Sequence, residues 1–144
     1  MGLTDNQNEM RGVLLMLFAL VFSLSSCSRV SSGPDENAFR DKTFVHRYFE
    51  TEEDCLKAQP DPDFFVNCHQ QVDFFSNNEV EIVLSDIIWR GDYIVEGDMV
   101  ILSFQPNFEI PDGEINFEIL NLSVLRKLDD NTRWVMMRAN SIWK

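Results

Sequence analysis

Three cysteines and two histidines are the residues of this sequence best suited to covalent or metal chemistry. Cys27 stands alone near the N-terminus, whereas Cys55 and Cys68 are close together in the chain. Cys55 and Cys68 could form a disulfide, remain as free buried thiols, or bind a metal ion together with His46 and His69. Zinc sites usually contain tighter pairs such as C-x2-C, so the spacing argues against the metal site.

No motif for catalysis or nucleotide binding accompanies these residues. The sequence lacks G-x-S-x-G, H-E-x-x-H, a P-loop and the glycine fingerprint of dinucleotide-binding proteins. A Ser-His-Asp or Cys-His device would need His46, which lies in an expected strand, or His69, which follows a cysteine expected to be oxidised. We therefore predict no enzyme, no catalytic residue, no bound metal and no cofactor.

A short apolar run explains the position of Cys27. Residues 13–24 are apolar except for one serine and number twelve. This is too short for a membrane-spanning helix, which needs roughly 20 residues, but it suits a secretory signal of roughly 7–15 residues. Arg11 precedes the run, and the letters LSSC that end at Cys27 resemble the lipobox of bacterial lipoproteins. The resemblance implies cleavage before Cys27 and its acylation, with fatty chains such as palmitate.

This interpretation makes the membrane a partner through the N-terminal lipid, because several acyl chains hold a protein stably to a bilayer. Ser28 follows the cysteine, whereas in some bacteria an Asp there retains lipoproteins at the inner membrane, so we expect the outer membrane of a bacterial envelope. The alternatives are an ordinary signal peptide with an incidental cysteine, or a retained transmembrane anchor. Met10 is a better translation start than Met1, because residues 1–9 are polar and acidic.

The chain is acidic, with 24 Asp and Glu against 12 Lys and Arg, and its net charge is −12. This balance argues against nucleic acid as a partner and against direct adhesion to anionic lipid. A basic protein or metal cations remain as charged partners. An even pair of cysteines in an oxidising envelope compartment favours the disulfide between Cys55 and Cys68.

Composition divides the chain into three parts. Residues 1–26 form the predicted signal peptide. Residues 27–42 are rich in Ser, Gly, Pro and charged residues, which is typical of a flexible tether. Residues 43–144 form a single domain that is long enough to bury a core.

Short segments of alternating apolar and polar residues dominate this domain. We expect strands at 43–50, 64–75, 79–84, 86–90, 93–96, 99–104, 114–120, 122–128 and 133–138, and a short N-terminal helix that begins at Thr51. Gly91-Asp92 is interpreted as a break, and Gly97-Asp98 as a two-residue hairpin turn. The pattern fits an antiparallel sandwich or an up-and-down barrel, and a closed barrel removes exposed edges. We predict an all-β fold, a small antiparallel up-and-down barrel of about eight strands.

Aromatic residues are frequent, with twelve Phe, three Trp and two Tyr. A small eight-stranded barrel is either filled by its side chains or holds one small apolar ligand. The many Phe residues favour an interior filled by side chains. The alternative is a cup that holds a ligand. The candidate barrel-lining residues are Phe104, Phe117 and Trp134 inside, with Trp89 and Tyr93 near a rim or turn. The doublets 64–65 and 74–75 place successive side chains on opposite faces of a strand, so one member of each could be exposed for a protein contact.

Residues 74–134 resemble the lipocalin-like small lipoproteins of bacterial envelopes. The residues that carry the resemblance are Gly91, Tyr93, Val95, Gly97, Asp98, Phe104, Phe117, Ile119, Leu125 and Trp134. The resemblance implies a barrel but no particular activity. The helix and the cysteine pair depart from a simple lipocalin.

Two functions are therefore hypotheses. The first is a non-enzymatic, lipid-anchored module that binds a small apolar ligand or acts as a scaffold. The second is a protein-interaction module, such as an inhibitor of a basic hydrolase that attacks the envelope. Small barrel lipoproteins with a disulfide include lysozyme inhibitors, and a strongly negative protein attracts a basic target.

Overall fold

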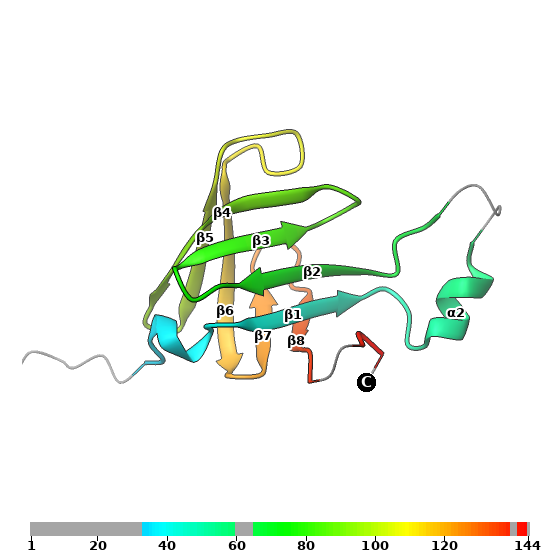
Figure 1. Cartoon of the computed structure of the whole chain (residues 1–144), viewed down its shortest axis with the longest axis horizontal. Helices are drawn as coiled ribbons and strands as arrows, with labels where there is room; N and C mark the ends of the chain where they lie inside the picture. Colours follow the sequence, from blue (N-terminus) through cyan, green and yellow to red (C-terminus); the bar gives the residue numbers. More distant parts are fainter. Residues whose placement is uncertain (1–32, 60–64, 139–140, 144) are drawn as a thin grey trace, which may run out of the picture. The chain divides into compact units, whose positions relative to one another are not determined.

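The computed structural model of the chain describes residues 33–59, 65–138 and 141–143. Within these ranges the strands form a closed antiparallel barrel in which each strand pairs with the next and β8 pairs with β1 (Figure 1). The strands are β1 (Lys42–Arg47), β2 (His69–Phe74), β3 (Glu79–Val83), β4 (Ile88–Glu96), β5 (Met99–Phe104), β6 (Glu114–Asn121), β7 (Val124–Lys127) and β8 (Arg133–Met136). The prediction of an all-β, up-and-down barrel is confirmed.

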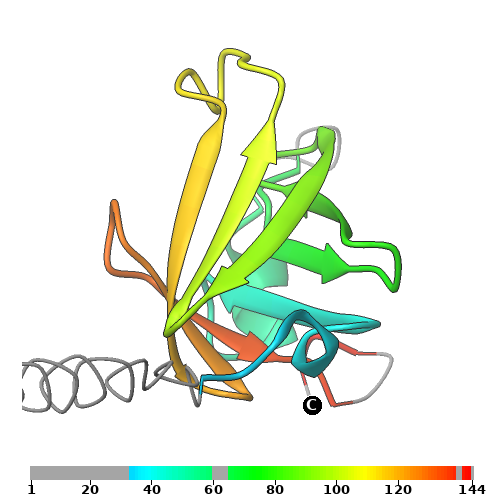
Figure 2. The ribbon, with the colours of Figure 1, turned by 90° about the vertical axis from the view of Figure 1, so that its left-hand side faces the viewer.

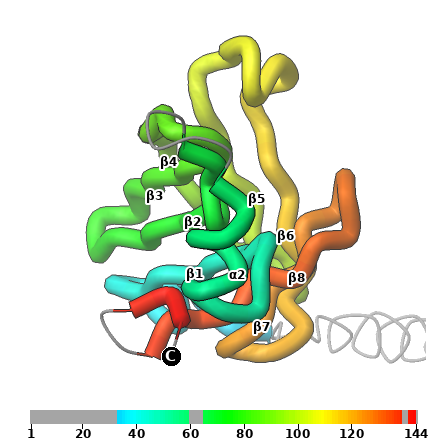
Figure 3. Tube along the Cα trace, turned by 90° about the vertical axis from the view of Figure 1, so that its right-hand side faces the viewer, coloured from blue at the N-terminus to red at the C-terminus, as the bar shows by residue number. Residues whose placement is uncertain are grey.

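The barrel has two ends that differ in what closes them. The entry end, where the described chain begins, contains residues 33–41 and the turns 75–78, 97–98 and 122–123 (Figure 2). The far end contains the turns 84–87, 105–113 and 128–132 and the connection between β1 and β2 (Figure 3). That connection holds the short helix α2 (Glu52–Lys57), as predicted.

The folded part begins earlier than the predicted boundary at residue 43. A short 3-10 helix, η1 (Glu36–Ala38), lies in the segment expected to be tether, and Phe39 after it is fully buried. The ring of Phe39 lies 6.0 Å from that of Phe44 and 5.6 Å from that of Phe74. Phe39 therefore closes the entry end, because an open barrel end would leave those apolar side chains in water.

The predicted break at Gly91-Asp92 is wrong, because β4 runs continuously through both residues. Gly91 is required by packing and not by a turn. A Cβ atom on Gly91 would lie 2.1 Å from the carbonyl oxygen of Ser103 and 2.7 Å from the ring of Phe104. The predicted Gly97-Asp98 hairpin is confirmed: Glu96 pairs with Met99 and Gly97 has a φ of 65°.

We expect Gly91→Ala to lower the free energy of unfolding by about 1–3 kcal/mol, since the backbones of β4 and β5 must separate and the Phe104 ring must also move to admit the methyl group. Urea unfolding followed by tryptophan fluorescence measures the loss. Asp92→Ala, which removes the neighbouring exposed side chain on the same strand, is the control and should change stability little. Equal stability of the two variants would contradict the packing role of Gly91.

Cys27 and the predicted signal peptide lie outside the described residues. None of the helices in the described ranges has the length and hydropathy needed to cross a bilayer.

Candidate functional site

The inward-facing aromatic residues fill the barrel. Phe117 and Trp134 are both fully buried, and their rings meet edge to face with 5.3 Å between centroids. Tyr93 is 2% exposed and Phe104 is 9% exposed, and both belong to the same continuous core. Of the two sequence-based alternatives, this packing matches a filled interior. Three cavities lined by described residues lie elsewhere, at the far end, on the outer wall and beside the helix α2.

Trp89 and Tyr93, which the sequence placed near a rim or turn, reach opposite ends of the barrel. Trp89 is half-buried at the far end, where its ring packs 5.7 Å from that of Phe108 and its indole N–H donates to the carboxylate of Glu109. Tyr93 is deeper, but its hydroxyl donates to the carbonyl of Glu36 at the entry end over 3.3 Å. Neither side chain lines an internal ligand cup.

A cavity of about 490 Å³ opens at the far end. It lies between the turns 105–113 and 128–132, with Leu84 from the turn after β3. Its lining combines apolar and charged side chains: Leu84, Ile110, Pro111, Ile115 and Leu128 are apolar, whereas Glu109, Asp112, Glu114, Asp129 and Lys127 are charged. A second hollow of about 550 Å³ lies on the outer wall over β3 and β4.

Lys127 stands at the base of the far-end cavity and is only 8% exposed. Its Nζ atom lies 2.9 Å from a carboxylate oxygen of Asp129 and 3.1 Å from one of Asp130. Burial by itself lowers the pKa of Lys127, but the hydrogen bonds to the two aspartates outweigh it, so the pKa is raised. Lys127 therefore carries a charge that its neighbours already neutralise.

A polar network connects this cluster to the core. Asp130 also accepts from the backbone N–H of Thr132 at 2.9 Å and from its hydroxyl at 2.6 Å. Burial acts to raise the pKa of Asp130, but the Thr132 and Lys127 bonds lower it below the ordinary value. The hydroxyl of Thr132 in turn accepts from the indole N–H of Trp134 at 3.0 Å. The turn 128–132 is thus fixed against the barrel interior.

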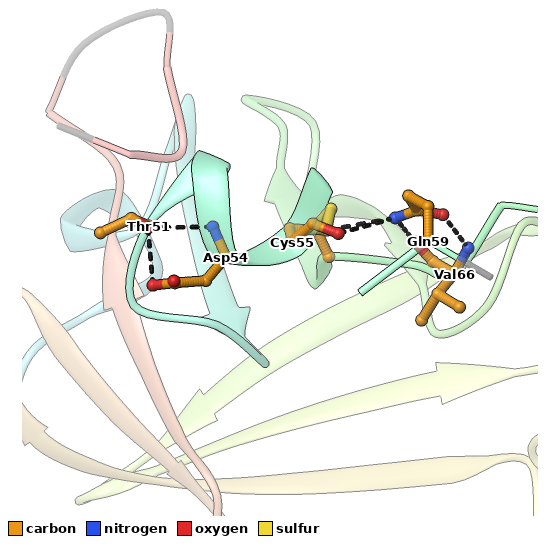
Figure 4. Close-up of a disulfide and its surroundings, with 6 residues drawn as sticks. Thr51, Asp54, Cys55, Gln59 and Val66 are labelled. Carbon is orange, nitrogen blue, oxygen red and sulfur yellow. Dashed lines mark hydrogen bonds between the residues drawn. A yellow bond between two sulfur atoms is a disulfide. The ribbon is translucent and has the colours of Figure 1, made fainter. Parts of the chain in front are cut away.

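The second feature of the far end is the arm, by which we mean residues 48–59 and 65–68. The predicted disulfide between Cys55 and Cys68 is confirmed, and it joins α2 to the residue before β2 with a Cα–Cα distance of 5.7 Å. Both sulfurs are therefore used, which excludes free thiols and thiolate metal ligands at this position. Thr51 caps α2 as expected, its hydroxyl accepting from the N–H of Asp54 at 3.1 Å (Figure 4).

Gln59 holds the two sides of the arm together. Its amide N–H groups donate to the carbonyls of Cys55, at 3.1 Å, and of Val66, at 3.2 Å, and its amide oxygen accepts from the N–H of Val66 at 2.7 Å (Figure 4). The disulfide and this clamp give the arm a fixed shape, although a helix of six residues is too short to be stable alone.

A small groove of about 280 Å³ borders the arm. Leu56, Val66, Ile142 and Trp143 supply its apolar lining, and Glu52 and His69 are among its polar residues. Burial lowers the pKa of His69, and a hydrogen bond with Gln71 partly offsets that effect. His46 is separate from this groove: its Nδ1 lies 3.1 Å from the carbonyl oxygen of Arg133 and its ring faces Trp134.

The lowered pKa of His69 predicts a pH-dependent stability. The folded state disfavours the protonated ring, so this contribution is fully present above the ordinary pKa of about 6.5 and is lost as the pH falls below it toward the folded-state pKa. We expect the fall in melting temperature between about pH 7.5 and pH 5 to be smaller for His69→Gln than for the natural protein. Calorimetry at both pH values measures this, and identical pH dependence in the two proteins would refute it.

Exposed apolar side chains gather at the far end. Phe108 is 76% exposed, Leu56 65% and Phe65 80%, and the other members of this group are Tyr48, Val66, Ile88 and Leu128. The two Phe doublets predicted that one member of each could be exposed. Phe65 is exposed, and Phe75 is exposed while Phe74 is buried. The exposure of Leu56, Ile88 and Phe108 was missed, because a six-residue helix, the first residue of a strand and a turn show no periodic pattern that reveals it.

The described residues contain no group of three or more His, Cys, Asp or Glu side chains placed to hold a metal ion. No protein family, curated protein sequence or solved structure matches this chain. What the protein binds is therefore inferred from the surfaces described above.

Proposed function

We propose that the chain is a non-enzymatic lipoprotein of the bacterial envelope, anchored through Cys27, that binds a basic protein at the far end of its barrel. The observation that carries this proposal is the combination of a filled interior with a far end rich in both exposed apolar and acidic side chains. Surfaces with apolar patches of this kind commonly mark protein contacts. Because aromatic side chains fill the interior, we assign the binding surface to the rim of the barrel and not to its inside.

The charges of the far end favour a basic partner. Acidic residues stand on α2 and on all three far-end turns: Glu52, Glu53, Asp54, Asp86, Glu109, Asp112, Asp129 and Asp130. Two basic residues among them are engaged, since Lys57 pairs with Glu53 at 2.7 Å and Lys127 pairs with the two aspartates. Complementary charge accelerates association and selects the partner, while the apolar residues supply affinity.

The partner class that fits is a basic hydrolase that attacks the envelope, such as lysozyme. The net charge of −12 supports long-range attraction to such an enzyme. The resemblance to lipocalin-like small lipoproteins is compatible with this role, since small barrel lipoproteins with a disulfide include lysozyme inhibitors. The far-end cavity, lined by apolar residues and carboxylates, has the chemistry to accept a Lys or Arg side chain of the partner.

The far-end cavity is also the candidate site for the small-molecule ligand of the first hypothesis. Its volume of about 490 Å³ is within the usual range for ligand pockets. Its carboxylates favour a ligand with a cationic group over the purely apolar ligand that the sequence suggested. The candidate barrel-lining residues Phe104, Phe117 and Trp134 do not contribute to it.

The proposal is tested by reversing charge at one end of the barrel at a time. We expect Glu52→Lys/Asp112→Lys, at the far end, to weaken binding to a c-type lysozyme by about tenfold or more, because both exposed carboxylates would then repel the basic partner. Isothermal titration calorimetry measures the dissociation constant. The weakening should shrink at high salt, which screens exposed charges.

The matched control is Glu96→Lys/Asp98→Lys, which changes the net charge by the same amount at the entry end. We expect it to bind nearly as well as the natural protein. If both double variants lose the same affinity, the attraction is a general charge effect and the far-end surface is not the binding site. If the natural protein does not bind the lysozyme, the proposed partner class is wrong.

A further inference from the structure

Two leucines project from the entry end of the barrel. Leu120, near the end of β6, is 43% exposed, and Leu122, in the short turn between β6 and β7, is 48% exposed. The pairing of these strands shifts between Ile119 and Asn121, so Leu120 occupies an irregular position in the ladder. Alternation along β6 turns Ile115 and Phe117 into the barrel, so Leu120 lies on the outward face and is left in solvent.

These leucines lie close to the point where the chain enters the fold. A Cβ atom on Gly33 would lie 2.5 Å from the carbonyl oxygen of Gly97, so the two backbones are in contact. The next residue, Asp98, accepts through its carbonyl from the N–H of Ile119 at 2.7 Å. A continuous path of contacts therefore connects Gly33 to the residue that precedes Leu120.

The stretch of chain between the proposed anchor, Cys27, and the first described residue, Gly33, is short. Five residues stand between Cys27 and Gly33, so the two are six residue-to-residue steps apart. Even when fully extended, this stretch reaches about 20 Å. A lipid on Cys27 would therefore keep the entry end within this distance of the bilayer surface.

We propose that Leu120 and Leu122 contact the headgroup region of the bilayer to which Cys27 is anchored. This inference depends on the proposed lipidation. Apolar side chains of membrane-bound segments typically enter the interface by about 5–10 Å, which a turn held this close to the membrane can reach. Glu96 and Asp98 flank the turn between β4 and β5 and repel anionic lipid, so the surface fits a zwitterionic one.

The contact fixes the orientation of the domain. With the entry end at the membrane, the arm and the far-end cavity face away from it, where a soluble partner can reach them. A lipid-anchored domain without such a contact would rotate freely about its tether.

The test uses the mature, acylated protein in phosphatidylcholine vesicles that contain a lipid with a nitroxide near the headgroup. Leu122→Cys carries an environment-sensitive fluorophore, and Ile88→Cys, at an exposed far-end position, is the matched control. We expect the nitroxide to quench about half of the fluorescence at position 122 and little at position 88. With the fluorophore on Ser123→Cys instead, adding Leu120→Ser and Leu122→Ser should remove the quenching.

The outcomes separate this inference from the proposed anchor. Intact mass spectrometry reports whether Cys27 is acylated, and an unacylated protein overturns both proposals. An acylated protein without quenching at position 122, or with equal quenching at positions 122 and 88, overturns only the bilayer contact. Energy transfer between labelled copies without nitroxide quenching would assign the leucines to a second copy of the chain and would also overturn it.

Discussion

Trp134→Ala is expected to lower the free energy of unfolding by about 3–5 kcal/mol, the range for removing a large buried aromatic side chain. Trp134 is fully buried, packs edge to face on Phe117, and donates its indole N–H to Thr132. Its loss leaves a large cavity and also releases the hydrogen bond that fixes the turn 128–132. Urea denaturation followed by circular dichroism measures the change.

Val135→Ala is the control for this variant, because Val135 is the next residue of β8 and its side chain is 44% exposed on the outside of the barrel. We expect it to cost less than about 1 kcal/mol. If Trp134→Ala has nearly the stability of the natural protein, the interior is loosely packed and contains unfilled space. That result would restore the ligand cup as an interpretation.

Removal of the disulfide by Cys55→Ser/Cys68→Ser is expected to lower the free energy of unfolding by up to about 3 kcal/mol. The two cysteines are 13 residues apart, and the bond limits the freedom of that segment in the unfolded chain. In the folded state the bond also holds α2 against the start of β2, so its loss should loosen the arm. We therefore expect weaker binding to the basic partner in addition to lower stability, measured by urea denaturation and by calorimetric titration.

Leu56→Ser provides the comparison for the disulfide variant, because it changes an exposed residue of the same helix and leaves the bond intact. It should weaken binding with little effect on stability. If the disulfide variant binds as tightly as the natural protein, the arm does not belong to the binding surface, and the far-end turns alone remain.

The regular part of the fold could be predicted because the periodicity of a strand repeats along the sequence. Alternation in β3 and β6 and the Gly97-Asp98 turn identified neighbouring strands, and short turns required antiparallel pairs. Gly91 was misread as a break in the strand. The sequence does not reveal whether a glycine is needed for a turn or for close packing against a neighbouring ring. Phe39 was missed because a single apolar residue in a polar segment does not reveal that it closes a barrel.

The candidate site was less predictable than the fold. Strand alternation separates the inside of a barrel from its outside, so interior positions could be predicted for Phe117 and Trp134, which are fully buried. The pairing of Cys55 with Cys68 could also be expected from their even number and from the export signal that the sequence predicts. The far-end cavity could not be predicted, because Leu84, Asp112 and Lys127 are far apart in the sequence and come together only when the barrel closes.

The central claim is that the far end, and not the interior, is the binding surface. Hydrogen–deuterium exchange of the full mature protein, alone and with a c-type lysozyme, tests it most directly. We expect the lysozyme to slow exchange in the arm and in the turns 105–113 and 128–132, while the entry-end turns 97–98 and 122–123 exchange as before. Protection confined to the entry end or to the strands that enclose the aromatic core, or no protection anywhere, would contradict the claim.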